Sequence, residues 1–474
     1  MKLSFPVRIY LAALILRLIP VLLARNLGIG LDDMFQYDML ARSISSGNGF
    51  RWYAQEDLRQ LEAYVNFDLS TASGYDPRYG MYTSFRAPLY PTFLASVYYL
   101  SGTGFERFFA ARAAQALFLG APLAPLTYLV ARHLIPNSES QARASAWIIA
   151  CYPMLLVYPL GLGTENPFFV LLLASFLFLL KALYVPSGWN MVFAGLFLGL
   201  TTLTRSVILP FAGLSILYFL FLHRSKATLV GLAFVLLISP WIIRNSLLHG
   251  KLTGIETSMG YNLYLGYHPQ GNGSFIFGPS LDLLTIMDDS KRDQVGTERA
   301  LAFIREQPER FLPLAVNRLG FFLGLEKRVL MYFYSNNILG YIPAPALLLT
   351  SVLLLLPFVL ICLLSAFSLP LMAENQKSTL LAILFISYMF PHIFILSEDR
   401  FHLALVPYLA ILSTSGWVFL LNRIHWKSVN RRLVLVSVIT AVLLIVNWGF
   451  ELHRDADKIA QILGPHGNTS YFPY

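Results

Sequence analysis

Two adjacent carboxylates, Asp32 and Asp33, follow the first long apolar segment of the sequence and begin a polar stretch. The apolar segment, 7–24, is long enough to cross a bilayer, which takes about 20 mostly apolar residues. Charges at the edge of a membrane are costly unless they have partners or a function. Glu165 follows another apolar segment and supplies a third carboxylate. Such groups could serve as a general base on a hydroxyl group; the alternatives are a solvated loop for the pair and a helix cap for Glu165.

Several arginines lie in short polar motifs that could meet these carboxylates: Arg86, Arg205, Arg244 and Arg400, the last within Glu398-Asp399-Arg400-Phe401-His402. A guanidinium matches phosphate oxygens with a bidentate fork. Carboxylates and arginines on one side of a membrane suit a reaction in which a base activates an acceptor while cations hold a lipid phosphate. A single arginine at a helix end can instead extend its head group to the lipid surface.

Other polar side chains in these motifs are candidate substrate-binding residues: Tyr37, Asn245, Asn262, His268 and His402. The two histidines could equally be solvent-exposed bystanders. No His/Cys cluster has the spacing of a metal site, so the sequence leaves metal use open, with a divalent ion or none as possibilities. Cys151 and Cys362 both lie in apolar segments and offer neither a disulfide framework nor a metal site.

The elements that must position these residues are membrane helices. Of the 474 residues, 56% are hydrophobic and only 13% are charged, against about 25% charged in soluble domains. The net charge of +9 does not indicate nucleic-acid binding, because the basic residues are spread over short loops. The composition predicts an all-α polytopic membrane protein with one domain, 1–474. Its apolar segments predict about eleven spans: 7–24, 106–131, 144–162, 166–184, 190–204, 206–222, 227–243, 342–369, 379–396, 403–421 and 433–450.

The segment 87–100 decides the topology, because it is short, contains Pro88 and Pro91, and suits a non-spanning helix. If it does not span, the basic loops fall on one side, with Lys2 and Arg8, as the positive-inside rule expects. These loops carry Arg132/Arg143, Lys181, Arg224/Lys226, Lys377 and Arg423/Lys427/Arg431/Arg432. We therefore expect a cytoplasmic N-terminus, a cytoplasmic 422–432 and an outer C-terminus.

Two large polar regions then share the outer face. The first is 25–105 with its non-spanning helix, and the second is 244–341 with surface helices on either side of Pro308. Arg17, near the middle of the first span, needs a partner in the bilayer. Its depth suggests an interior ion pair rather than chemistry.

In their order along the chain, the polar motifs resemble those of the GT-C superfamily of integral-membrane glycosyltransferases. The nearest branch is that of the protein O-mannosyltransferases and the lipid A aminoarabinose transferases. Each motif is a weak signal, but their order between the right helices is specific. The motifs are Asp32-Asp33 with Tyr37, Arg86–Pro91, Thr164-Glu165, Leu203-Thr204-Arg205 and Pro240-Trp241 followed by Arg244-Asn245. The resemblance covers roughly 1–270 and returns at 400–407.

The resemblance implies a polyprenyl-phosphate-linked sugar as donor and a lipid, glycan or protein acceptor outside the cytoplasm. Asp33, which lies four residues before Tyr37, matches the catalytic aspartate of the family, and Asp32 occupies a variable place. We interpret the chain as an inverting hexosyl- or pentosyltransferase of a bacterial or archaeal plasma membrane, active on the outer face and without a nucleic-acid partner. A base at Asp33 would suit a pKa raised by burial or by Asp32.

Two other classes are alternatives. A lipid-linked glycan polymerase or ligase would share the chemistry but use a lipid diphosphate donor. A lipid or sugar transporter or flippase also needs charges within the membrane, but many transporters consist of two related halves with broken helices. The sequence has no recognisable internal repeat.

Overall fold

The computed structural model describes residues 3–72, 74–371, 375–421 and 430–470. The regular structure of the described chain is helical, apart from one short antiparallel pair of strands, β1 (Arg51–Trp52) and β2 (Met81–Tyr82). Eight described helical segments are long and apolar enough to cross a membrane, or nine if the bent pair Glu139–Cys151 and Pro153–Leu160 is one span. The protein is thus a multi-pass helical membrane protein, as the composition predicts.

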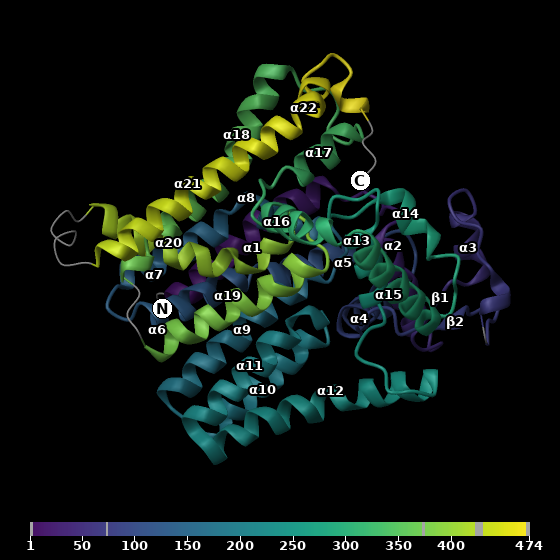
Figure 1. Cartoon of the computed structure of the whole chain (residues 1–474), viewed down its shortest axis with the longest axis horizontal. Helices are drawn as coiled ribbons and strands as arrows, with labels where there is room; N and C mark the ends of the chain where they lie inside the picture. The colour runs from purple at the N-terminus through teal and green to yellow at the C-terminus, as the bar shows by residue number, and fades with distance from the viewer. Residues whose placement is uncertain (1–2, 73, 372–374, 422–429, 471–474) are drawn as a thin grey trace.

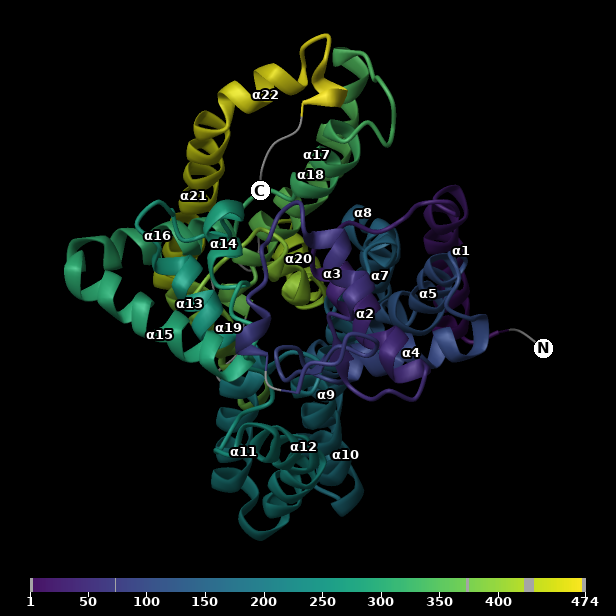
Figure 2. The ribbon, with the colours of Figure 1, turned by 90° about the vertical axis from the view of Figure 1, so that its right-hand side faces the viewer.

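The helices of the membrane region fall into three consecutive groups along the chain. The first comprises α1 (Phe5–Leu23), α5 (Arg107–Gln115), α6 (Leu123–Leu134), α7 (Glu139–Cys151), α8 (Pro153–Val157) and α9 (Glu165–Tyr184). The second comprises α10 (Gly188–Thr202), α11 (Leu209–His223) and α12 (Thr228–His249), which lie together in Figure 2. The third comprises α18 (Ala344–Ala366), α19 (Gln376–Phe394), α20 (Val406–Leu421), α21 (Arg431–Arg454) and the short α22 (Ala456–Ile462).

The predicted count of eleven spans is not confirmed. The described segment Ser206–His249 counts once as a candidate span, although it contains both α11 and α12, with Arg224 in a left-handed conformation (φ 44°) between them. The 15-residue α10 is not among the candidate spans. The difference arises where apolar segments are short or broken, because length and composition alone cannot decide whether such helices cross.

Arg17 illustrates how one of these breaks is stabilised. The side chain of Arg17 is fully buried, and its guanidinium donates to the carbonyl oxygens of Ile149 (3.1 Å) and Ala150 (3.3 Å). Pro153 has no N–H with which to satisfy the carbonyl of Ile149. Arg17 therefore replaces a missing helix hydrogen bond at the α7–α8 bend. The expectation of an interior ion pair is wrong, since the described hydrogen bonds of Arg17 go to backbone oxygens.

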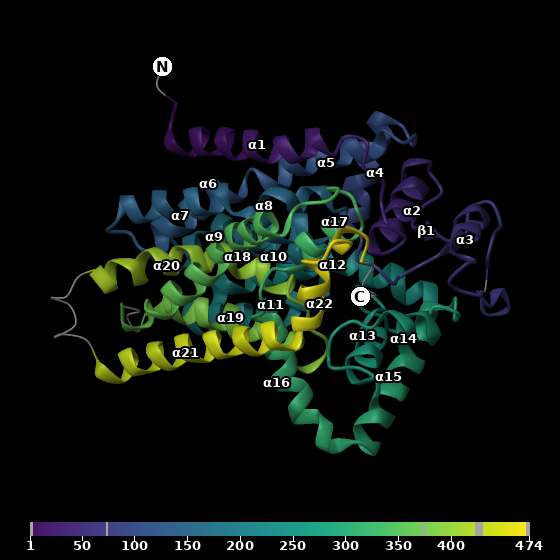
Figure 3. The ribbon, with the colours of Figure 1, turned by 90° about the horizontal axis from the view of Figure 1, so that it is seen from above.

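The long helices run side by side, with the polar regions at one end of the bundle (Figures 1 and 3). Basic connections lie at the other end. There Lys377 donates to the carbonyl oxygen of Leu134 (2.7 Å), and Tyr184 donates to that of His133 (2.9 Å). Arg143 at this end lies over the ring of Phe5, where α1 begins. The gathering of basic loops agrees with the charge pattern behind the predicted topology. Arg423 and Lys427 lie outside the described residues.

The first polar region carries α2 (Asp33–Ser45), α3 (Gln55–Leu61), the strand pair and α4 (Leu89–Ser101). Asp32 caps α2 by accepting a hydrogen bond from the backbone N–H of Met34 (2.8 Å). The buried Asp38 then joins α2 to the next helices, because it accepts from Tyr98 (2.9 Å) on α4 and pairs with Arg107 (2.7 Å) on α5. At 1.5 Å per residue, α4 is about 20 Å long, which is short for a span.

The second polar region carries α13 (Met259–Tyr267), α14 (Phe277–Asp282), α15 (Asp289–Glu306), α16 (Phe311–Phe322) and α17 (Arg328–Ser335). It contacts the first region directly. Asp289 at the start of α15 accepts hydrogen bonds from the hydroxyl of Thr83 (2.6 Å) and the backbone N–H of Ser84 (2.8 Å). The backbone N–H of Thr257 donates to the carbonyl oxygen of Ser84 (3.0 Å). These bonds hold the segment that leads into Arg86.

Candidate active site

Asp33 lies at the start of α2, beside two of the predicted arginines. Oδ1 of its carboxylate pairs with Arg86, and Oδ2 lies 3.6 Å from Nη2 of Arg400. The side chain of Asp33 is 42% exposed, so it is accessible from outside the protein. Residues 33, 86 and 400 come from three distant parts of the chain, and folding brings them to one place.

The first turn of α2 also positions Arg86. Gln36 and Tyr37 follow Asp33 by three and four residues and therefore share its side of the helix. Gln36 accepts from Nε (2.9 Å) and Nη2 (2.6 Å) of Arg86. The guanidinium of Arg86 lies 5.2 Å from the ring centre of Tyr37, within the range of a cation–π contact. Burial raises the pKa of Tyr37 to about 12, so its hydroxyl stays protonated and can donate a hydrogen bond.

Glu165 and Arg205 form the second half of the cluster. Glu165 is the first residue of α9, and its Oε1 lies 2.8 Å from Nη1 of Arg205 and 3.6 Å from Nη1 of Arg400. Arg205 follows the end of α10, and its guanidinium lies 5.2 Å from the ring centre of Phe401. Arg400 therefore stands between Asp33 and Glu165, in an alternating series of charges that begins at Arg86 and ends at Arg205.

Two further charges belong to this group, and the sequence does not single them out as site residues. The same oxygen of Glu398, Oε2, lies 2.7 Å from Nε of Arg400 and 2.5 Å from Nη1 of Arg328. Glu398 lies in a motif noted for Arg400, but Arg328 belongs to none. The signal that could have found it is the run of three charges at Glu326-Lys327-Arg328 between apolar stretches.

A second missed carboxylate, Glu256, borders the cluster. It accepts from the backbone N–H (2.9 Å) and the hydroxyl (2.5 Å) of Ser206, next to Arg205. Glu256 also interacts electrostatically with Arg86. It carries no recognisable motif, since its role depends on the fold bringing the second polar region over Ser206.

The two aspartates differ in basicity. Partial burial raises the pKa of Asp33, but the cations Arg86 and Arg400 outweigh this effect and hold its pKa at about 2. Removal from water raises the pKa of Asp32, and the negative charge of Asp33 adds to this effect. The expectation of a raised pKa at Asp33 is therefore wrong for the protein without substrate, because its two arginine partners stabilise the charged form.

Arg244 and Asn245 lie apart from this series of charges. Arg244 donates to the carbonyl oxygen of Thr83 (2.5 Å) and to Oδ1 of Asn245 (2.9 Å), and its guanidinium lies 4.8 Å from the ring of Trp241. Asn245 is fully buried and donates to the carbonyl oxygens of Gly254 (2.8 Å) and Ile255 (3.0 Å). In the described chain these contacts brace the segment that precedes Arg86 rather than touch a carboxylate of the cluster.

The remaining predicted binding residues have other surroundings. His402 is buried: its Nδ1 lies 2.7 Å from the carbonyl oxygen of Phe322, and its Nε2 lies 3.1 Å from Glu326. His268 lies edge-on to Tyr264, with ring centres 5.2 Å apart. Asn262 lies on α13 in the second polar region. The structure thus assigns His402 to the protein interior and gives no contact that joins the three residues to Asp33.

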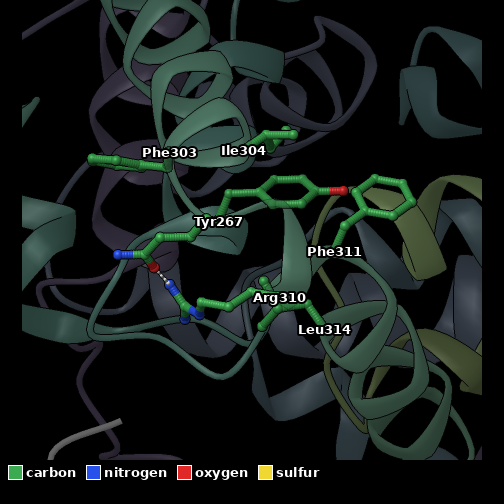
Figure 4. Close-up of a pocket in the computed structure, with 7 residues that line it drawn as sticks. Tyr267, Phe303, Ile304, Arg310, Phe311 and Leu314 are labelled. Atoms are coloured by element: carbon green, nitrogen blue, oxygen red, sulfur yellow. Dashed lines mark hydrogen bonds between the residues drawn. The ribbon is translucent and has the colours of Figure 1, made fainter.

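A small gap near His268 does not offer an alternative site (Figure 4). Tyr267 and Phe311 stack there, and Arg310 donates to Gln307 (2.9 Å). The space that these side chains enclose is too small to hold a water molecule. Within the described residues, no group of three or more His, Cys, Asp or Glu side chains could hold a metal ion, and metal use stays open.

No protein-family model matches the chain, and no curated protein matches it in sequence. Among solved structures, it is similar to the oligosaccharyltransferase AglB of Archaeoglobus fulgidus in complex with an inhibitory peptide and a dolichol-phosphate (13% identity, TM-score 0.48, covering 99% of this chain and 61% of that one). It is also similar to ArnT of Cupriavidus metallidurans bound to undecaprenyl phosphate (13% identity, TM-score 0.40, covering 86% and 77%). The chain thus spans about three fifths of the length of the archaeal enzyme.

Proposed function

We propose that this protein transfers a sugar from a polyprenyl-phosphate carrier to a hydroxyl acceptor on the outer face of the membrane. The observation that carries the proposal is the alternating series Arg86–Asp33–Arg400–Glu165–Arg205 at the polar end of the helices. It combines a carboxylate that is open to solvent with three guanidiniums, and these are the groups that the motif resemblance implies for such a transfer.

Arg400 is the best placed of the three for the phosphate. Its Nε is engaged by Glu398 at 2.7 Å. Its terminal nitrogens lie 3.6 Å from Asp33 and Glu165, beyond the usual length of a hydrogen bond. The two terminal nitrogens of one guanidinium are thus incompletely satisfied, and each lies near a different carboxylate. A phosphate could take both in a bidentate fork, and Arg86 and Arg205 flank this position.

The transfer we propose is a single displacement with inversion. The acceptor oxygen forms a bond to the anomeric carbon while the bond from that carbon to the phosphate oxygen breaks. The acceptor proton passes to the carboxylate of Asp33, and the polyprenyl phosphate leaves with the electron pair. Arg400, Arg86 and Arg205 stabilise the charge that develops on this leaving group.

This arrangement couples donor binding to the basicity of Asp33. Without donor, Arg86 and Arg400 hold its pKa at about 2, which makes a weak base. A phosphate that draws these guanidiniums toward itself would weaken their stabilisation of the carboxylate, and its own negative charge would favour the protonated form. Asp33 would then become a stronger base only when the donor is in place. Tyr37, on the same side of α2, could donate a hydrogen bond to the acceptor, and Asp32 adds a second carboxylate next to Asp33.

The test is transfer by the purified full chain in detergent, from short-chain polyprenyl-monophosphate and polyprenyl-diphosphate sugars to acceptor lipids, glycans and peptides. We expect transfer from a monophosphate donor that is lost in Asp33→Asn and kept in Glu139→Gln, a carboxylate at the opposite end of the bundle. Transfer from the diphosphate donors alone would favour the polymerase or ligase class. Movement of lipid across liposome membranes without transfer would contradict the enzyme proposal.

A further inference from the structure

Glu398 holds two guanidiniums on one oxygen atom. Oε2 lies 2.5 Å from Nη1 of Arg328 and 2.7 Å from Nε of Arg400. The carboxylate is 5% exposed, whereas the side chains of Arg328 and Arg400 are 30% and 27% exposed. A buried carboxylate thus pairs with two arginine side chains that are each partly exposed to solvent. Arg400 also lies 3.6 Å from Asp33 and from Glu165, so it joins the shared carboxylate to the rest of the cluster.

The position of Arg328 is set by the two residues before it. Glu326 is buried and accepts from the hydroxyl of Tyr152 (2.5 Å), and it lies 3.1 Å from His402. Lys327 lies 2.7 Å from Glu451 near the end of α21 and also pairs with Asp455. Three consecutive charged side chains therefore engage three different parts of the fold. In Figure 2, α17, which begins at Arg328, lies with α18 and α22 at the top of the view.

The consequence is a preorganised pair of arginines. Each of the two is anchored through Glu398, so neither has to lose much side-chain freedom when a ligand binds. Two guanidiniums that face solvent beside one another repel each other, and an anion with several oxygens relieves this repulsion. The leaving group of the proposed reaction, a lipid monophosphate, is such an anion and lies within reach of Arg400.

We infer that Arg328 is a further binding residue for the lipid phosphate, and that with Arg400 it forms a two-arginine clamp built on Glu398. This inference rests on the proposed function, since it names a further contact of the same leaving group. It assigns a role to α17 and, through Lys327, to the outer end of α21.

The experiment measures binding without transfer. A short-chain polyprenyl monophosphate is titrated by calorimetry into the full chain in detergent, with no sugar and no acceptor. Arg328→Ala is expected to weaken its affinity by between about tenfold and a hundredfold, the loss of one charge-assisted hydrogen bond. Arg328→Lys is expected to recover only part of it, since an ammonium cannot form the fork. Arg305→Ala, an exposed arginine on α15, is the matched control and should bind like the parent.

A double variant distinguishes phosphate binding by Arg328 from neutralisation of Glu398 by Arg328. If Arg328 serves only to neutralise Glu398, then Arg328→Ala combined with Glu398→Gln removes both charges and should restore the parental affinity. That result, or parental affinity in the folded Arg328→Ala variant, would overturn the inference. If Arg328→Ala does not fold, the lysine variant decides, and parental affinity there has the same meaning. A parental chain that binds no polyprenyl phosphate would contradict the proposed function itself, which is a different outcome.

Discussion

Two clusters of charged and polar side chains in this protein use similar residue types in opposite ways. In the cluster around Arg400, Asp33 is 42% exposed, and both terminal nitrogens of Arg400 lie 3.6 Å from carboxylates. At the junction around Asp289, the carboxylate and Arg292 are fully buried, and Asp289 accepts from Thr83 at 2.6 Å and Ser84 at 2.8 Å. The junction is buried and fully hydrogen-bonded, whereas the cluster is open to solvent at Asp33 and has long contacts at the terminal nitrogens of Arg400.

The two clusters contain similar residue types, so residue type does not distinguish a carboxylate that could act on a ligand from one that holds the fold together. The exposure of the side chain and the lengths of its contacts do distinguish them. A buried carboxylate with complete hydrogen bonding holds two segments together, and losing a partner is costly. An exposed carboxylate such as Asp33, which pairs with Arg86 but lies 3.6 Å from Arg400, leaves that second cation able to exchange its carboxylate neighbour for a ligand. Arg244 is a further example of residue type failing to indicate the role. Its motif resembles one from the active sites of a glycosyltransferase family, but its side chain contacts Thr83 beside the junction.

The largest expected effect on catalysis is at Asp33. Asp33→Asn keeps the size and hydrogen bonding of the side chain but removes the proton acceptor, so transfer should fall by about 10²–10⁴-fold. Thermal stability in detergent should stay near that of the parent, because the side chain is partly exposed. Asp32→Asn should lower transfer less. If Asp32→Asn is inactive and Asp33→Asn is not, the base is the other aspartate.

A substitution at the junction should lower stability more than it lowers transfer. Asp289→Ala leaves Arg292 buried without its carboxylate, and breaking a buried pair typically costs about 3–5 kcal/mol. We expect a lower free energy of unfolding, measured by denaturant or thermal unfolding in detergent. Transfer per folded molecule should fall much less than in Asp33→Asn. Parental stability with lost transfer would place Asp289 in the reaction instead.

Arginines from the two clusters provide a paired test. Arg400→Ala should raise the donor KM by between about tenfold and a hundredfold, because a charge-assisted bond to phosphate contributes about 1.5–3 kcal/mol. Arg244→Ala should mainly lower stability and raise the donor KM less, since its described contacts are with Thr83, Asn245 and nearby aromatic rings. Equal effects on the donor KM would remove the distinction between the clusters and return Arg244 to the phosphate site.

The smallest expected effect is a shift in pH dependence. Asp33 has a pKa of about 2 in the protein without donor, so its carboxylate stays ionised as the pH falls from 7 to 5. The acid limb of kcat/KM, which reports groups of the free enzyme, should therefore not arise from Asp33 in this range. Arg86→Gln removes a cation that lowers this pKa, so the pKa of Asp33 should rise, and a loss of kcat/KM at acidic pH that is absent from the parent should appear as Asp33 becomes protonated. An unchanged profile would mean that Arg86 does not govern the ionisation of Asp33.

Much of the candidate site was accessible from the sequence, because its parts lie in short motifs. Asp33, Arg86, Glu165, Arg205 and Arg400 are each conspicuous as charges at the ends of apolar segments. The cost of burying unpaired charge near a membrane makes such positions informative on their own. The structure brings these five residues together, while their roles in transfer stay predictions.

The sequence by itself determined the class of protein, since a chain with 56% hydrophobic and 13% charged residues can satisfy its backbone in a bilayer only as helices or a closed barrel, and its long apolar segments favour helices. Only the tertiary structure decided which charges meet. Glu398 joins Arg328 to Arg400, and Asp289 joins the second polar region to Thr83, which lies 206 residues away in the sequence. His402, next to the cluster in sequence, turns into the interior to meet Glu326. Local patterns report burial and helix period, but the pairing of distant side chains depends on how the helices pack.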